Sequence, residues 1–132
     1  MGRRNMISVK LLDIIDASPI LRKLAESTFS GAVAFKIARL IKACEIELQT
    51  FEESRRKIIE EYGEKDEKGE LKIFDNQQIK VKEEYREKCA VSLNELLNTE
   101  IELNVSKIPV NSLEQIDITP NELIKMEAFI EE

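Results

Sequence analysis

The longest regular pattern of apolar and polar positions in this chain runs from Ala32 to Tyr62. Alternating steps of four and three residues connect its apolar or long side chains, as in a helix that packs along its whole length. Ser30 precedes the run as a candidate N-cap, and Gly63 follows it, where a left-handed residue would end the helix. The sequence therefore predicts a helix roughly 46 Å long. Its stripe consists of Ile37, Ile41, Cys44, Leu48, Phe51, Arg55, Ile58 and Tyr62.

A second helical pattern extends from Ile79 to Asn98, and we expect it to fold back antiparallel on the long helix. Its stripe consists of Val81, Tyr85, Cys89, Leu93, Leu96 and Leu97. The connector between the two patterns is polar. Asp66 to Gly69 lacks the acidic spacing of a calcium loop and is interpreted as a turn, followed by a short strand with Leu71 and Ile73 on one face. Asp75-Asn76 signals a second turn.

The pattern before the long helix is ambiguous. Ile7, Val9 and Leu11 alternate as in a strand, whereas the apolar residues from Leu11 to Ile15 suit a short helix. We favour a helix from about Val9, and we expect residues 1–5 to be a disordered extension. Ser18 and Pro19 predict the start of a second short helix that ends near Ser27.

After Asn98 the period changes from helical to alternating. Ile101, Leu103 and Val105 predict a half-buried strand, with Pro109 at a sheet edge. A further short strand is expected from Leu113, Ile116 and Ile118. Thr119-Pro120-Asn121-Glu122 predicts the start of a final helix with a capping box, whose inward face is Leu123, Met126, Phe129 and Ile130.

These patterns predict a mainly α chain with a small β element, an α+β class built from a long helical hairpin, short strands and a C-terminal helix. The 132 residues suffice for a single domain, 1–132. The formal charge of −6 argues against a nucleic-acid partner. No apolar run reaches the length of a membrane span, and no secretory signal is evident, so we expect no membrane partner and a cytoplasmic location.

Candidate chemistry is sparse. The chain contains no histidine, which removes the commonest general base and most zinc sites. Cys44 and Cys89 lie far apart on apolar stripes and are expected to be buried, reduced thiols. Two carboxylate groups, at 60–64 and 83–87, would meet at one end of a hairpin, but helix ends are normally charged. We therefore expect no enzyme, no catalytic residue, no metal and no cofactor.

Three stretches carry a resemblance: FSGAVAFKIARLIKACEIELQTFEESRRKIIEEYGEKDEKGE, LNELLNTEIELNV and ITPNELIKMEAFIEE. They resemble a family of small uncharacterised proteins encoded by phages and prophages of Gram-positive bacteria. The resemblance covers most of the chain from about Ile20 and contains no motif diagnostic of chemistry. It implies a viral origin, a bacterial host cell, and a role in virion assembly or as a minor structural component. The alternative role is binding a host protein, as an inhibitor or trigger of a defence system.

The predicted long helix exceeds its best intrachain cover, which is roughly 30 Å long. We therefore expect another chain to bury part of the stripe or the face beside it, with interface candidates Ile46, Phe51, Arg55 and Tyr62. A second copy of the chain, another phage protein and a host protein are all candidate partners. A monomer whose own elements cover the helix remains the alternative.

Overall fold

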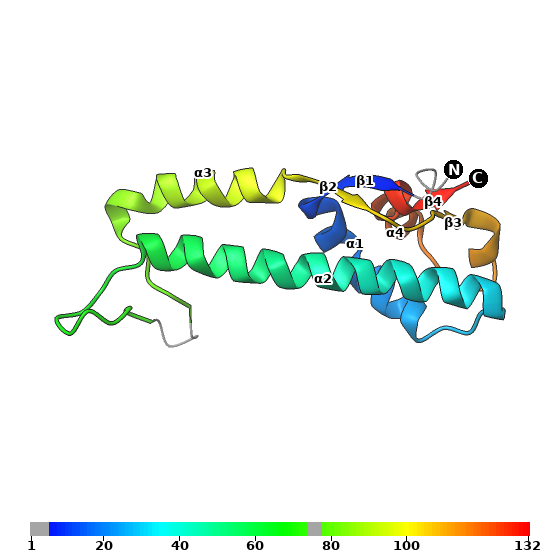
Figure 1. Cartoon of the computed structure of the whole chain (residues 1–132), viewed down its shortest axis with the longest axis horizontal. Coiled ribbons are helices and arrows are strands. Elements are labelled where there is room, and N and C mark those ends of the chain that lie inside the picture. Colours follow the sequence, from blue (N-terminus) through cyan, green and yellow to red (C-terminus); the bar gives the residue numbers. More distant parts are fainter. Residues whose placement is uncertain (1–5, 74–77) are drawn as a thin grey trace. The chain divides into compact units, whose positions relative to one another are not determined.

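The computed structural model describes residues 6–73 and 78–132 and is mainly helical, with two small sheets (Figure 1). This confirms the expected α+β class. The chain forms two compact units. Unit 1 comprises Met1–Leu48 and Thr99–Glu132, and unit 2 comprises Gln49–Asn98. The long helix α2, Gly31–Tyr62, contributes to both. Folding as one domain stays a prediction, and the expected extension 1–5 and turn at Asp75-Asn76 lie outside the described residues.

Unit 1 contains both sheets. Strand β1 (Ile7–Lys10) pairs antiparallel with β2 (Glu100–Leu103), and Ile7 stands opposite Leu103. Alternate β1 side chains are buried, which is the two-residue period visible in the sequence. Strand β3 (Ile108–Pro109) pairs parallel with β4 (Ile130–Glu131). The expected strand is confirmed as far as Leu103, and Val105 beyond it is buried.

Helix α1 spans Leu11–Ala25 and corrects two predictions. The helix does not begin at Val9, because that residue pairs with Ile101 in the sheet. The boundary predicted at Ser18 and Pro19 is also wrong, since α1 continues through Pro19. An interior proline costs a helix about 3 kcal/mol, but burying each Leu or Ile side chain returns about 1.5–3 kcal/mol. Pro19 is exposed, while the opposite face buries Ile14, Ala17, Leu21 and Leu24.

The C-terminal part of unit 1 contains α4 (Pro120–Lys125), which begins with the predicted capping box. The amide of Glu122 donates to the Thr119 hydroxyl at 3.2 Å, and the amide of Thr119 donates to the Glu122 carboxylate at 2.9 Å. Met126 and Phe129 are buried as predicted. The strand expected at Leu113, Ile116 and Ile118 is wrong. Val110–Leu113 forms a 3₁₀ turn instead, because Ser112 and Ile116 make local hydrogen bonds to backbone carbonyls.

In unit 2, helix α3 (Arg86–Leu97) runs antiparallel to the second half of α2 (Figure 1). The predicted helical hairpin is therefore present, but α3 is shorter than the predicted 79–98. A 3₁₀ turn at Glu83–Tyr85 precedes it, and Ile79 to Val81 are extended. The Asp66–Gly69 turn is confirmed: the Asp66 carboxylate accepts the amides of Lys68 and Glu70, and Gly69 has a φ of +83°.

Three short extended segments of unit 2 meet in one junction. They are centred on Glu64, Lys72 and Lys80, and each pairs antiparallel with the other two. The amide of Glu64 donates to the carbonyl of Lys80, that of Lys80 to Lys72, and that of Lys72 to Glu64, at 2.7–2.8 Å. The Glu64 carboxylate also forms ion pairs with both lysines, at 3.0 and 3.3 Å. We call this arrangement the three-way β junction.

Gly63 ends α2, but not in the left-handed conformation that the sequence suggested. Among the glycines the structure describes, only Gly69 has a positive φ. Gly63 is buried, and a Cβ there would lie 2.6 Å from Leu71 Cδ2 and 3.0 Å from Ile79 Cγ2. A glycine at this position therefore allows the junction to pack closely against the end of the helix.

Candidate interaction groove

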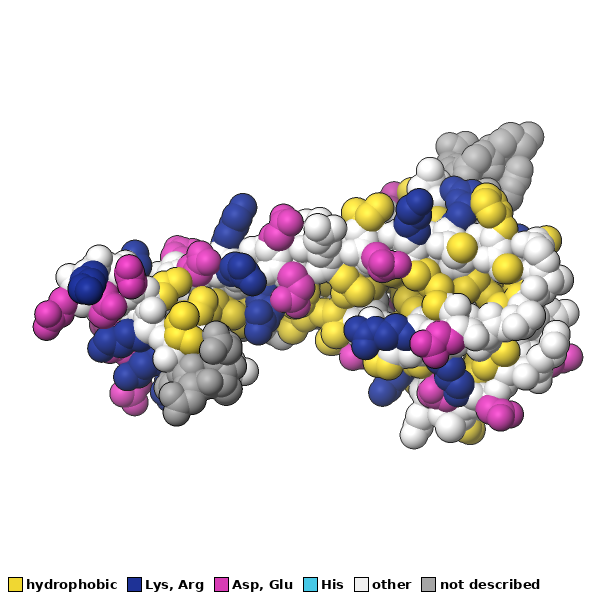
Figure 2. Space-filling model, turned by 90° about the horizontal axis from the view of Figure 1, so that it is seen from below, with side chains coloured by type: hydrophobic (Ala, Val, Ile, Leu, Met, Phe, Trp, Pro, Cys, Tyr) yellow, Lys and Arg dark blue, Asp and Glu magenta, His cyan; other side chains and the backbone are white. Residues whose placement is uncertain are grey.

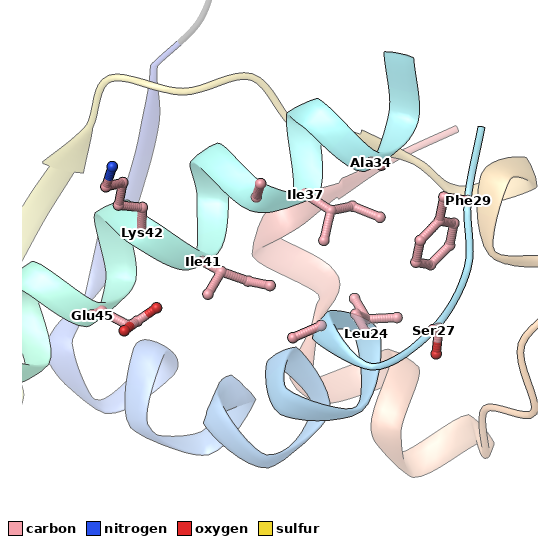
Figure 3. A pocket seen from close by; sticks show the side chains of 10 residues that line it. Leu24, Ser27, Phe29, Ala34, Ile37, Ile41, Lys42 and Glu45 are labelled. Atoms are coloured by element: carbon pink, nitrogen blue, oxygen red, sulfur yellow. The ribbon is translucent and has the colours of Figure 1, made fainter. Parts of the chain in front are cut away.

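An apolar groove lies between α1 and the first half of α2, entirely within unit 1. Leu24, Ile37 and Ile41 point into the space between the two helices, and Phe29 closes one end (Figure 3). Figure 2 shows apolar side chains gathered in the hollow of this unit. The groove consists of two adjoining cavities of about 390 and 320 Å³, which share Ala25, Ile41 and Glu45.

The groove forms because α2 presents small side chains beside its buried stripe. Ile37, Leu40 and Cys44 of α2 are buried in the core of unit 1. Ala34 and Ala38 stand next to them, and an alanine extends too little to fill the space up to α1. Ala38 is exposed and Ile41 is only half-buried. A groove of this length, roughly 21 Å from Ala34 to Leu48, would hold three to four turns of a helix.

Three charged side chains border the apolar floor: Arg22 from α1, and Lys42 and Glu45 from α2. Lys42 and Glu45 are one helical turn apart and carry opposite charges. Neither has an ion-pair partner within residues 6–73 and 78–132. The groove thus combines an apolar interior with unpaired charges at its edge, as interfaces commonly do.

Cys44 lies at the bottom of the groove but offers no reactive thiol. It is buried, and burial, reinforced by the nearby carboxylates of Glu47 and Glu45, raises its pKa to about 12. A thiol with that pKa is almost entirely protonated at neutral pH and is a poor nucleophile. The groove is therefore suited to binding rather than to covalent chemistry.

The interface candidates named from the sequence divide between the two units: Ile46 belongs to unit 1, and Phe51, Arg55 and Tyr62 belong to unit 2. Ile46 of unit 1 is 59% exposed and lies on the side of α2 away from the groove. Phe51 of unit 2 is buried. Arg55 forms a 3.7 Å ion pair with Glu52, and the ring centroid of Tyr62 lies 5.7 Å from that of Tyr85. An interface through these four residues stays a prediction.

Unit 2 contains a pocket of about 560 Å³ between α2, the three-way β junction and α3. Its walls are mostly apolar, with Arg55, Arg56 and Glu60 at its edge. Cys89 lines it and is buried, and this burial raises the pKa of its thiol. A protonated thiol beside aliphatic side chains provides no activated nucleophile. Both cysteines are free and buried, as predicted.

The two carboxylate groups expected at one end of the hairpin form no metal site in the described part of the chain. There, no three Asp, Glu or Cys side chains lie close enough together to hold a metal ion. Glu64 instead pairs with two lysines. The hydrogen bond from Lys72 and the smaller effect of that from Lys80 lower the pKa of the Glu64 carboxyl below its ordinary value of 4.5. The ionised Glu64 carboxylate therefore stabilises the three-way β junction through its two ion pairs.

The groove was not predicted from the sequence, although its α2 side has a regular spacing. Ala34, Ala38, Ile41, Glu45 and Leu48 are spaced by four, three, four and three residues, the same rhythm as the predicted stripe. Two of these positions are alanines and one is charged, so the pattern does not stand out as a contact face.

Across the described ranges, no helix has both the length and the apolar character needed to span a lipid bilayer. The chain matches no protein-family model, and no similar protein was found among curated proteins or solved structures.

Proposed function

We propose that this protein is a non-enzymatic, cytoplasmic interaction module of phage or prophage origin that acts in virion assembly or as a minor virion component. The observation that carries the interaction role is the groove between α1 and α2. It has an apolar floor, exposed small residues and unpaired charges at its edge. Exposed apolar surface of this kind marks sites where proteins bind one another. The phage origin rests on the sequence resemblance alone.

The chemistry of the cavities supports a non-enzymatic role. Catalytic sites usually contain titratable groups whose pKa values are tuned toward neutral pH. Here the burial of Cys44 and Cys89 moves their pKa values away from neutrality, and the chain has no histidine. Glu64 and Glu122 have lowered pKa values because hydrogen-bonding partners hold them ionised. These shifts are typical of structural ion pairs.

A photo-crosslinking side chain at Ala38 tests the interaction role in cells that produce the phage. Ala38 is an exposed helix position in the groove, and Ala90 is an exposed helix position in unit 2 outside it. We expect a discrete crosslinked product with a virion protein, or with the chain itself, from position 38 and none from position 90. A crosslink to a host protein at position 38 would favour the alternative role in host interaction. The absence of any specific product at position 38 would refute the groove as a binding site.

A further inference from the structure

We propose that the outer edge of β2 in unit 1 binds an extended segment of a partner protein, which adds to the small sheet as a further strand and places basic residues beside Glu100 and Glu102. This edge is separate from the groove between α1 and α2 and adds a second binding surface to the proposed function. Its outward backbone groups, its two exposed carboxylates and the half-buried Ile101 between them define the partner.

The pairing of β2 with β1 determines which backbone groups of β2 point outward (Figure 1). The register of the two strands continues to Thr99, whose carbonyl accepts the amide of Leu11 at 3.1 Å. In an antiparallel ladder, every second opposite pair of residues exchanges hydrogen bonds. Counting from Thr99, Ile101 also bonds to β1, whereas the backbone amides and carbonyls of Glu100 and Glu102 point away from it.

These outward groups are available for pairing. Within the described ranges, no other backbone group bonds to the outward side of Glu100 or Glu102. The carbonyl of Asn104, which follows on the same side, accepts a 3.5 Å hydrogen bond from the guanidinium of Arg39 and ends the open stretch. Arg39 and Val105 line a hollow of about 270 Å³ there, so the space beside this end of β2 is not filled.

The outer edge of β1 offers fewer groups to an added strand. By the same count, its outward groups belong to Ser8 and Lys10, and the Lys10 amide already donates to the Asp13 carboxylate at 2.9 Å. An edge with unused amides and carbonyls is a template for pairing with another extended chain. The edge of β2 is therefore the one that a partner would extend.

The side chains of β2 specify the chemistry of the partner. Glu100 and Glu102 are exposed, and neither has an ion-pair partner in residues 6–73 and 78–132. Residues directly opposite each other on neighbouring strands share a face, so lysine or arginine opposite each glutamate would form two ion pairs. The residue between them would lie beside the half-buried Ile101 and should be apolar. A second β2 is a poor partner, because it would place carboxylates against carboxylates.

A short peptide in which lysine alternates with valine, blocked at both ends, is the probe. We expect saturable binding to the full chain in isothermal titration calorimetry. Methylating the lysine backbone amides should weaken binding about tenfold or more, because these amides donate to the carbonyls of Glu100 and Glu102 in antiparallel pairing. Methylating the valine amides is the matched control: they point away from β2, so the affinity should change less than about twofold. A glutamate–valine peptide should not bind.

Glu102→Pro tests the same edge from the side of the protein. It removes an outward amide and leaves the hydrogen bonds between β1 and β2 in place, as proline does on an edge strand. We expect it to weaken peptide binding about tenfold or more. Ser8→Pro is the matched control, since it removes an outward amide of β1 instead and should leave binding unchanged. Circular dichroism should show the same helix content in both variants.

Hydrogen exchange of the wild-type chain locates the peptide without any substitution. Binding should slow exchange of the Glu100 and Glu102 amides and leave that of the Ser8 amide unchanged. The proposal would be overturned by a lack of saturable binding up to about 1 mM peptide, by binding that ignores methylation of the lysine amides, or by protection confined to other parts of the chain. None of these results affects the crosslinking test at Ala38, which reports on the groove alone.

Discussion

Replacing Gly63 by alanine tests the three-way β junction at its tightest point. The new Cβ would lie 2.6 Å from Leu71 Cδ2, 3.0 Å from Ile79 Cγ2 and 3.2 Å from the Ile59 carbonyl oxygen. The leucine methyl can rotate away, but the carbonyl belongs to the last turn of α2 and cannot move without bending the helix. The substitution therefore forces the junction away from the helix end.

Two opposing effects determine how much Gly63→Ala should change the free energy of unfolding. Overpacking a tight site costs about 1–3 kcal/mol. Alanine also lowers the conformational entropy of the unfolded chain, which stabilises the folded state by about 0.4–1 kcal/mol. Gly63 has no positive φ, so alanine adds no backbone strain there. The net expected destabilisation is about 1–2 kcal/mol. Gly31→Ala is the matched control: nothing lies within 4 Å of its added Cβ, so it should be neutral or slightly stabilising.

Native-state hydrogen exchange measures this effect locally. The amides of Glu64, Lys72 and Lys80 form the cyclic set of hydrogen bonds in the junction. In Gly63→Ala they should exchange about tenfold faster, since 1.4 kcal/mol corresponds to one factor of ten. Protection of these amides that equals or exceeds the wild-type value would refute the close packing of Gly63 against Leu71 and Ile79.

Three further outcomes follow from the structure. Thr119→Ala should lower the free energy of unfolding in denaturant melts by about 1 kcal/mol through loss of the α4 cap, whereas the exposed Thr28→Ala should not. Cys44 and Cys89 should react with a thiol reagent at pH about 8 far more slowly than in the unfolded chain; rapid labelling of the native protein would contradict their burial. The ionised Glu64 carboxylate should contribute stability that is fully present above its ordinary pKa of 4.5 and is lost as the pH falls through the lowered pKa of the folded state. In Glu64→Gln, the free energy of unfolding measured by urea melts should therefore depend less on pH below about 4.5.

Local sequence signals predicted the elements of this fold where tertiary packing agrees with them. The period of α2 is sustained over its whole length, α2 begins directly after Ser30, and the predicted cap at Thr119 begins α4. Pro19 is the opposite case. Proline inside a helix normally marks a helix boundary, and the sequence predicted one there. The buried positions of α1 nevertheless keep the same helical spacing before and after Pro19. Burial in the core of unit 1 outweighs the lost helix hydrogen bond.

The three-way β junction could not be predicted from periodicity. Ile79 and Val81 fit the helical pattern of α3, yet their segment pairs with residues near Glu64 and Lys72. The three segment centres are spaced by eight residues, and each hydrogen bond joins two segments that are separate in the sequence. Pairing between these segments joins residues eight or sixteen apart, and neither a helical nor an alternating period of apolar positions reports such contacts. The position of Gly63 was predicted correctly, but the reason for its presence was not.

The α2 helix carries two apolar stripes in unit 1, and this explains why its pattern predicted more apolar surface than the core of the unit buries. The first stripe contains Ile37, Leu40 and Cys44, which are buried within unit 1. The second is the groove stripe centred on Ile41, roughly a quarter turn further round the helix. The first stripe packs into the core of unit 1, whereas the second faces the groove, where Ile41 and Leu48 are only half-buried. Within unit 1, the excess of apolar surface therefore lies along the side of α2, so substitutions at Ala38 and Ile41 test the proposed groove interaction more directly than one at Ile46.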